Sequence, residues 1–379
     1  MDITEQVLKD NSGRRPEMLL RKWVKMKANA FTFLRGTAPL GQRILHEALP
    51  QKLWSQSPTA WLCGDAHPEN AGTYRGWDRQ VYFDINDFDE SVRASVLWDI
   101  GRAGTALSFI DAALVEPFLA AYREALLGGK ALAYTPATKA ASSITLQLLE
   151  QVSERKRADF LEEHTRDGKL LIVPDHTFAL SKEEKALALS LFKSWAATQP
   201  EPQIYKVYDV TGRLAGNGSL GVPRYVFLVK GRKQPHIIDA KLAAGPALRD
   251  LAGGQPAWSC EAERVATAQR QLQYMPILDL GWHRLPTGES YLMKELQPLA
   301  DRITLERLLK RDQRAFVGDW AKLLAGCHIR GSGWKGASTL DSLQTWAAEF
   351  QPRSLLGAVK ASKQQTVEAW RSFCKHPPA

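Results

Sequence analysis

Apolar and polar positions along the chain predict helices near both ends and a strand-rich middle. From about residue 198, short runs of β-branched and aromatic residues replace the longer helical patterns. Strands are expected over 59–63, 80–85, 205–210, 224–229, 236–241, 277–282 and 290–294. Helices are expected over 16–34, 96–127, 138–163, 181–197, 259–274 and 303–328, and the C-terminal part also has a helical pattern. This mixture predicts an α+β fold.

The first long helix, 16–34, is basic and amphipathic. Its apolar stripe has helical spacing and consists of Leu19, Leu20, Trp23 and Met26. A globular body follows at once, so a core-facing helix is favoured over a helix that lies on a membrane surface. Within the apolar stretch 96–127, Pro117 is expected to divide the pattern into two helices.

Composition and charge narrow the possible partners. The 379 residues carry a net charge of +9, and 44% of them are hydrophobic, which is ordinary for a globular protein. The Lys and Arg residues are scattered rather than gathered in one tail, a balance that suits an anionic ligand such as nucleotide phosphates. The sequence has neither zinc-finger spacing nor an aromatic–basic RNA signature. Nucleic acid is therefore not expected as a partner.

Cysteine spacing and the first residues predict the cellular compartment. The four cysteines lie far apart without a CxxC pair, and we expect them to be free thiols in a reducing cytosol. The polar, acidic N-terminus does not resemble a signal peptide, and no apolar stretch approaches the ~20 residues that span a bilayer. We expect a cytoplasmic protein with no membrane segment. The oligomeric state stays open.

The most informative motif is GDAHPEN at residues 64–70, which follows a short apolar run. Asp65 could take the proton of an attacking hydroxyl, and Asn70, about one turn later, could hold a divalent metal against phosphates. His67 could orient Asp65 or its loop by hydrogen bonding. The plainer interpretation is a loop with an Asp cap and an Asn turn.

A second acidic cluster, at residues 84–90, should supply the partner carboxylate. Asp84, Asp87 and Asp89 compete for this role, and Asp87 fits best as a carboxylate at the end of a strand. Crowded carboxylates raise one another's pKa unless a cation joins them, so the cluster suggests a divalent metal. The alternative is an exposed acidic turn. Asp99, further on, is expected to brace the loop around Asp65.

A glycine-rich segment between two strands suggests a loop that covers phosphates. It comprises Gly216, Gly218, Ser219 and Gly221. Because no helix follows directly, the segment differs from a dinucleotide fingerprint and is more typical of a glycine-rich hairpin. Lys241 ends a later strand, where it could reach α- and β-phosphates. Glu261 or Glu263 on the following helix could pair with Lys241, and Glu263 is slightly favoured.

Two further side chains are candidates for the nucleotide site. Arg35 lies beside a glycine in a predicted loop, where it could reach a phosphate or form a structural ion pair. Glu295 lies in the segment 291–296, which reads as a last strand and the hinge to a helical part.

These motifs resemble the protein-kinase-like superfamily, especially aminoglycoside and choline phosphotransferases. Residues 64–70 resemble the catalytic loop of those enzymes, and residues 85–88 resemble their metal-binding segment. The interval from Asp87 to Asp99 also matches the interval in those enzymes between the metal-binding segment and a later structural Asp. The resemblance implies ATP and Mg²⁺ as cofactors.

Nearly the whole chain also resembles a bacterial domain-of-unknown-function family, number 2252. The matching pieces occur in order at 33–36, 64–70, 84–90, 98–99, 216–221, 264–265, 269–270 and 323–328. In ordinary kinases the glycine-rich loop precedes the catalytic loop, whereas here it follows by about 150 residues. We therefore expect a two-lobed, circularly permuted kinase-like fold with a β-rich small lobe and a helical large lobe.

Four segments follow from this interpretation. They are an N-terminal helical segment (1–60), the catalytic-loop and metal-binding part of the helical lobe (61–197), a β-rich nucleotide-binding lobe (198–297) and the C-terminal part of the helical lobe (298–379). The expected activity is magnesium-dependent phosphotransfer from ATP to a hydroxyl of an unknown small molecule or protein. Nucleotidyl transfer and a non-catalytic nucleotide-binding scaffold are the alternatives.

Overall fold

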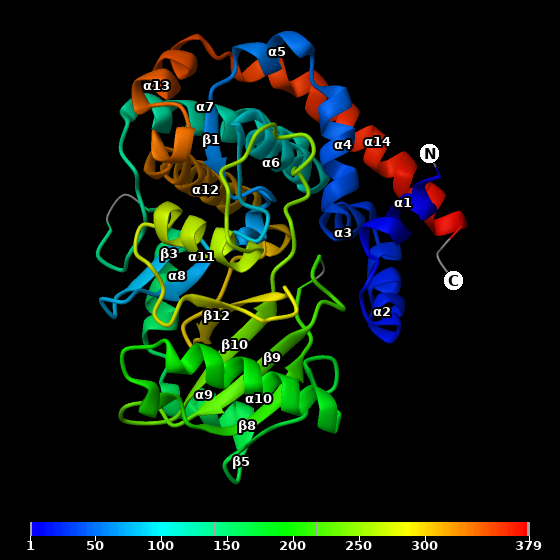
Figure 1. The fold of residues 1–379 in the computed structure, drawn as a ribbon. Coiled ribbons are helices and arrows are strands. Elements are labelled where there is room, and N and C mark those ends of the chain that lie inside the picture. The colour runs from blue at the N-terminus through cyan, green and yellow to red at the C-terminus, as the bar shows by residue number, and fades with distance from the viewer. Residues whose placement is uncertain (1, 139–140, 217, 377–379) are drawn as a thin grey trace.

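The computed structural model describes residues 2–138, 141–216 and 218–376. Asn217, in the middle of the glycine-rich segment, lies outside the described residues. Most helices gather at one end of the molecule, which we call the helical region, and a six-stranded sheet fills the other end, the sheet region (Figure 1). The prediction of a mixed α+β chain is confirmed.

The elements follow one another in a helical, mixed and again helical order. The helices are α1 (Ile3–Asp10), α2 (Pro16–Lys27), α3 (Ala30–Gly36), α4 (Ala38–Ala48), α5 (Gln51–Gln56), α6 (Leu97–Ile110), α7 (Val115–Gly128), α8 (Ser143–Ser153), α9 (Arg157–His164), α10 (Lys182–Ala197), α11 (Glu261–Leu272), α12 (Lys310–Arg330), α13 (Leu340–Glu349) and α14 (Leu356–Lys375). The strands are β1 (Thr59–Leu62), β2 (Ala71–Arg75), β3 (Val81–Ile85), β4 (Val92–Ser95), β5 (Thr165–Arg166), β6 (Lys169–Leu170), β7 (Thr177–Phe178), β8 (Val207–Arg213), β9 (Arg224–Val229), β10 (His236–Leu242), β11 (Gly281–Arg284) and β12 (Ser290–Leu296).

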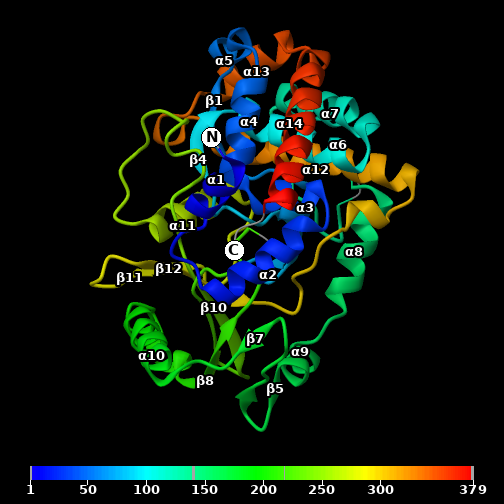
Figure 2. The same cartoon turned by 90° about the vertical axis from the view of Figure 1, so that its right-hand side faces the viewer.

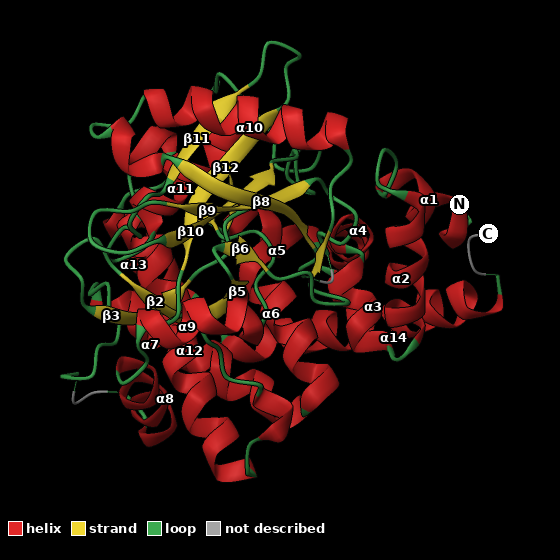
Figure 3. Ribbon diagram, turned by 90° about the horizontal axis from the view of Figure 1, so that it is seen from below, coloured by secondary structure: helices red, strands yellow, loops and turns green. Residues whose placement is uncertain are grey.

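The large sheet is antiparallel, with the strand order β11-β12-β10-β9-β8-β7. Helix α10 lies across one face (Figure 3), where Phe192 and Trp195 pack against buried side chains such as Phe227. Because side chains alternate along a strand, Asp239 and Lys241 share one face of β10. Asp239 pairs there with Arg224 of the neighbouring strand β9 and with Arg213 of β8. The sheet thus has an apolar face under α10, and a second face that carries these charges beside a small apolar cluster of Val226, Leu228 and Ile237.

Two small two-stranded sheets in the helical region position the loops that carry the acidic motifs. Strand β1 pairs with β4 and β2 pairs with β3, both antiparallel. The loop that contains Asp65 joins β1 to β2, and the loop that contains Asp87 joins β3 to β4. Helices α6, α7 and α12 pack behind them in the largest core of the described residues. The hydrophobic strands are therefore rigid supports for two polar loops.

The N-terminal helices pack against the end of the chain. Trp23 and Phe33 contact Phe373 of α14, and the hydroxyl of Thr4 donates to the carbonyl oxygen of His376 at 2.5 Å. Figure 2 shows α1 and the end of α14 side by side. The predicted stripe is only partly correct. Trp23 and Met26 are buried, whereas Leu20 is 56% exposed.

Pro117 does not divide a helix, so that prediction was wrong. The helical stretch breaks between α6 and α7, at residues 111–114, and Pro117 lies in the first turn of α7. The first N–H groups of a helix have no partner within the helix, so a proline is tolerated there. None of the helices in the described ranges has both the length and the apolar character needed to cross a membrane.

Candidate functional site

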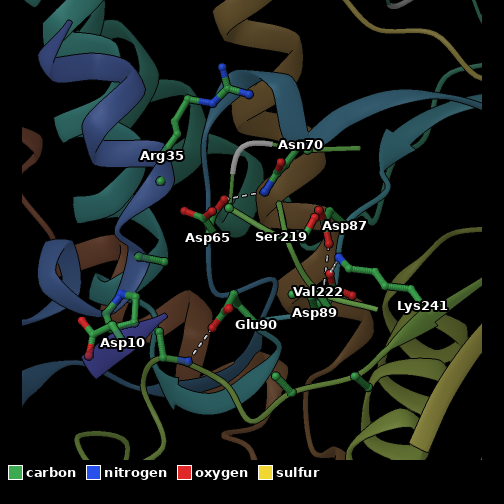
Figure 4. Close-up of a pocket in the computed structure, with 18 of the residues that line it drawn as sticks. Asp10, Arg35, Asp65, Asn70, Asp87, Asp89, Glu90, Ser219, Val222 and Lys241 are labelled. Atoms are coloured by element: carbon green, nitrogen blue, oxygen red, sulfur yellow. Dashed lines mark hydrogen bonds and ion pairs between the residues drawn. The ribbon is translucent and has the colours of Figure 1, made fainter. Parts of the chain in front are cut away.

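A charged cavity of about 260 Å³ lies where the N-terminal helices, the two acidic loops and the sheet meet (Figure 4). It collects most of the predicted site residues: Arg35, Asp65, His67, Asn70, Asp87, Asp89, Gly216, Gly218, Ser219 and Lys241. It also contains charged residues that the sequence did not predict for the site: Asp10, Arg14, Lys22, Glu90 and Arg302. Four predicted residues, Asp84, Gly221, Glu263 and Glu295, do not line it.

Buried Asp99 holds the backbone of the loop around Asp65. The carboxylate of Asp99 accepts hydrogen bonds from the backbone N–H groups of Cys63 (3.0 Å) and Gly64 (2.9 Å), and Nε2 of His328 lies 3.0 Å from it. Gly64 has a positive φ of 89°, and a Cβ there would overlap the carbonyl oxygen of Glu90. The expected bracing role of Asp99 is confirmed.

Arg102 of α6 orients the side chain of Asp65. The guanidinium is buried, and its Nε donates to Oδ1 of Asp65 at 2.9 Å. Burial alone would raise the pKa of Asp65, but Arg102 and then His67 outweigh it, so the pKa lies below its ordinary value. Asp65 is therefore an ionised carboxylate at neutral pH.

His67 does not hold Asp65 by a hydrogen bond. Its Nε2 lies 3.8 Å from Oδ2 of Asp65, which is too far. Burial, together with Arg35 and Arg102, lowers the pKa of His67 to about 3, so the ring is neutral. The predicted orienting role therefore belongs to Arg102, while His67 is an uncharged wall of the cavity.

Asn70 folds back onto the same loop. Residues Pro68–Asn70 form a short 3₁₀ turn, and Nδ2 of Asn70 donates to the backbone carbonyl of Asp65 at 2.6 Å. An amide whose nitrogen is engaged in this way keeps its oxygen as an acceptor. Asn70 can therefore offer an oxygen ligand to a cation in the cavity.

The acidic cluster divides into a structural and a site-facing part. Asp84 is fully buried in β3, where it accepts from Arg330 at 2.9 Å and from the backbone of Tyr274 at 2.9 Å. Its position outside the cavity corrects its assignment as a candidate metal ligand. Asp87, three residues on, follows the end of the strand and is exposed to the cavity. The preference for Asp87 over Asp84 matches this placement.

Lys241 reaches across from the sheet region to the second acidic loop. Its Nζ forms an ion pair with Oδ2 of Asp89, whose own backbone N–H donates to Oδ1 of Asp87 at 3.2 Å (Figure 4). Partial removal from bulk water and the neighbouring Asp89 carboxylate raise the pKa of Asp87. Burial would raise the pKa of Asp89 too, but Lys241 outweighs it and lowers that pKa.

The predicted partner of Lys241 was wrong. Glu263 accepts from the backbone N–H of Ser259 (2.6 Å) at the start of α11, and Glu261 pairs with Arg264 at 2.8 Å. A glutamate three residues into a helix can accept from a backbone N–H just before the helix, and the helix dipole favours acidic residues in the first turn.

Glu295 and Gly221 also have structural contacts elsewhere. Glu295 of β12 is buried, and it forms ion pairs with Arg75 of β2 and Arg157 of α9. Gly221 has a positive φ of 87° and lies against Arg14 of the N-terminal segment. Both predicted nucleotide contacts are therefore corrected, because neither residue lines the cavity.

The N-terminal segment, through Arg14 in the turn before α2 and Lys22 on α2, holds the glycine-rich loop. Nη1 of Arg14 donates to the carbonyl oxygens of Gly218 (2.5 Å) and Leu220 (2.9 Å), and Nζ of Lys22 donates to Gly218 at 2.9 Å. Arg35 forms two hydrogen bonds with Glu69, at 2.8 and 2.9 Å. The ion-pair alternative for Arg35 is therefore the observed one, although the side chain still lines the cavity.

Two of the missed residues left a signal in the sequence. Lys22 falls midway between Met18 and Met26, and residues four apart share one helix face, so the helical pattern placed a lysine on the buried side. Arg102 lies three residues after Asp99 and shares its helix face in the same way. A buried charge between buried apolar neighbours is a pointer to a functional site.

A metal ion would need ligands beyond the protein. The described ranges hold no group of three or more His, Cys, Asp or Glu side chains placed to bind a metal. Mg²⁺ commonly takes one or two carboxylates and completes its shell with water and substrate phosphates. Exposed Asp87 and the free amide oxygen of Asn70 fit that type of donor set.

Comparison with known proteins agrees with the sequence motifs at the level of the family. No curated protein and no solved structure matches the chain. Residues 14–376 match the family described as "Uncharacterized protein conserved in bacteria (DUF2252)", which covers all segments that build the cavity from Arg14 onward. The chain belongs to this bacterial family.

Proposed function

We propose that the chain is a magnesium- and ATP-dependent phosphotransferase acting on a hydroxyl group. One observation carries the proposal: Lys241 of the sheet region meets Asp87 and Asp89 in the cavity that also contains Asp65 and Asn70. A cation that could clamp phosphates, carboxylates suited to a metal and an ionised base are the parts that phosphoryl transfer requires.

Each side chain has a separate task in the proposed reaction. Asp65, held by Arg102, accepts the proton of the acceptor hydroxyl. The acceptor oxygen forms a bond to the γ-phosphorus while the bond from that phosphorus to the bridging oxygen breaks, and the electron pair stays on the departing ADP. Lys241 balances the negative charge of the phosphates. Asp87 and Asn70 would hold Mg²⁺, which supplies further positive charge.

The contacts between α12 and β1 support the permuted kinase-like arrangement. After α12 the chain runs beside β1: the backbone N–H of Ser338 donates to the carbonyl of Thr59 (3.0 Å), and Nε1 of Trp61 donates to the carbonyl of Trp334 (2.9 Å). A short link between these segments would restore the kinase order, with the sheet first and the catalytic loop later. The adjacent first and last helices fit the same interpretation, since permutation requires neighbouring ends.

Nucleotide binding to the full chain tests the proposal. Thermal unfolding is measured with ATP, ADP or no nucleotide, each with and without Mg²⁺. We expect Mg-ATP to raise the melting temperature, since ligand at 100 times its Kd stabilises by about 2.7 kcal/mol. Lys241→Met should weaken Mg-ATP binding by about tenfold or more, whereas Lys233→Met, an exposed lysine outside the cavity, should not. The absence of a shift with every nucleotide would refute the proposal.

Product analysis separates phosphoryl from nucleotidyl transfer. Mass spectrometry of the protein or of candidate acceptors, after incubation with isotope-labelled ATP, distinguishes an added phosphate with ADP release from an added AMP with pyrophosphate release. ADP release is the expected result, because Asp65 lies in one cavity with the metal-type donors.

A further inference from the structure

Two cations on the N-terminal wall of the cavity have only neutral hydrogen-bond partners among the described residues. Lys22 is 2% exposed, and its Nζ donates to Oδ1 of Asn11 (2.6 Å) and to the carbonyl of Gly218 (2.9 Å). Arg14 donates to the carbonyls of Gly218 and Leu220. Burial lowers the pKa of Lys22 and lowers that of Arg14 to about 10. In both groups the effect of burial on the pKa is larger than the opposing effect of the nearby carboxylates, Glu90 among them.

The nearest carboxylates are engaged elsewhere. Asp10 forms an ion pair with Arg43 at 2.7 Å and accepts from Gln6 at 2.6 Å. Glu90 accepts from the backbone N–H of Ala247 at 2.5 Å, and burial raises its pKa to about 7. A buried charge without a counter-charge is costly, so such a pair is retained where a ligand brings the missing charge.

The position of this pair differs from that of Lys241. Figure 4 shows Asp10 at one side of the cavity and Lys241 at the other, with Asp65 and Glu90 between them. Asn11, the residue after Asp10, bonds to Lys22, so Lys22 belongs to the side opposite Lys241. A molecule whose hydroxyl lies at Asp65 would reach Lys241 through the transferred phosphate and would reach Lys22 and Arg14 with its own far end.

We infer that Arg14 and Lys22 form an anion subsite that binds a phosphate or carboxylate group of the acceptor. The inference rests on the proposed function and narrows its substrate class to small anionic compounds that carry a free hydroxyl. An arginine fork beside a lysine ammonium suits an oxyanion. The same two side chains donate hydrogen bonds to the carbonyl oxygen of Gly218 in the glycine-rich loop. The bound acceptor and this loop would therefore be held by the same two cations.

Titration with simple anions tests the subsite on the full chain. Inorganic phosphate and acetate, as the phosphate and carboxylate probes, are titrated by calorimetry in chloride buffer. We expect wild-type protein to bind at least one of them, and Lys22→Met and Arg14→Gln each to weaken that binding by tenfold or more. Lys25→Met, an exposed lysine on the same helix, is the matched control and should bind like wild type. If Lys22→Met does not fold, the anion binding of Arg14→Gln alone tests the subsite.

Mg-ATP titration of the same variants separates this inference from the proposed function. Lys22→Met should keep Mg-ATP affinity within about threefold, whereas Lys241→Met should lose Mg-ATP affinity and keep phosphate affinity. Unchanged anion binding in Lys22→Met and Arg14→Gln would overturn the inference and leave these residues as a clamp on the loop. Equal losses of ATP and phosphate would assign the cations to the nucleotide and also overturn it. Anion binding that depends on Lys22, in a protein that binds no nucleotide, would refute the proposed function and, with it, the acceptor assignment.

Discussion

The two charged walls of the cavity differ in how the chain builds them. The acidic wall, with Asp65, Asp87 and Asp89, comes from two short loops held by two small two-stranded sheets. The basic wall comes from the N-terminal segment, with Lys22 on α2 and Arg14 in the turn before it, and it binds a loop about 200 residues away in sequence. The acidic charges lie beside one another and compete for a cation, whereas the basic charges have neutral hydrogen-bond partners within the part of the chain that the structure describes. The first wall is therefore suited to metal and proton chemistry, and the second to holding an anion.

The largest expected effect belongs to the acidic wall. Asp65→Asn keeps the size of the side chain but removes the base, and we expect ATP turnover to fall by about 10²- to 10⁴-fold. Mg-ATP affinity should stay within about tenfold, because Lys241 and Asp87 remain. Turnover is measured as ADP release, and affinity by calorimetry. Turnover equal to that of wild type would remove Asp65 from the mechanism and leave the acidic wall without a base.

Asp84 and Asp87 provide a comparison within the acidic cluster. Asp84→Asn leaves Arg330 in a buried site without its counter-charge, so the free energy of unfolding should fall by about 3 kcal/mol. Asp87→Asn should change it by less than about 0.5 kcal/mol, since Asp87 is exposed and its pKa is already raised. Urea unfolding of both variants measures the difference. Similar losses would mean that the two carboxylates share one structural role.

The sequence predicted contiguous features well and distant pairings poorly. The loops around Asp65 and Asp87 are short stretches whose chemistry and strand supports are both local, so the pattern located them. Arg102, Arg14 and the partner of Lys241 depend on which helix packs against which loop, and that is decided by tertiary packing. Glu263 was expected to pair with Lys241, but as a first-turn residue it found a nearer backbone partner in Ser259.

The strand pattern shows the same limit. The strand at 80–85 was expected and observed as β3, but no strand was expected at its partner β2, which contains Gly72. A Cβ at Gly72 would clash with the carbonyl oxygen of Asp301, a contact from a distant segment. The glycine therefore reflects a close approach between segments and does not mark a break in the strand.

The protonation of Glu90, which lines the cavity, makes the stability of the fold depend on pH. Its pKa rises from 4.5 to about 7 in the fold, mainly through burial and against the hydrogen bond from Ala247. A raised carboxyl pKa stabilises the fold below about pH 4.5, and this stabilisation is lost as the pH rises through 7. Because solvent reaches part of the side chain, we expect a loss of about 2 kcal/mol.

Glu90→Gln should remove this pH dependence. Between pH 5 and pH 8 the variant should gain about 2 kcal/mol of unfolding free energy relative to wild type. Urea unfolding at intervals of one pH unit measures the difference between the two profiles, which cancels the titration of other groups. Parallel profiles would show that Glu90 titrates normally and that the acidic wall carries one more full charge at neutral pH.

The smallest effect concerns two arginines that share one carboxylate. Arg35 donates twice to Glu69 and is 13% exposed, whereas Arg302 lies 3.2 Å from Glu69 and is 55% exposed. An exposed pair is screened by water, so Arg302→Gln should change the unfolding free energy by about 0.5 kcal/mol or less. Arg35→Gln should cost about 1.5 kcal/mol, because it breaks two charge-assisted hydrogen bonds in a largely dry setting. If Arg302→Gln nevertheless weakened phosphate binding as strongly as Lys22→Met, the basic wall would extend across the cavity, and burial would not be what defines the anion subsite.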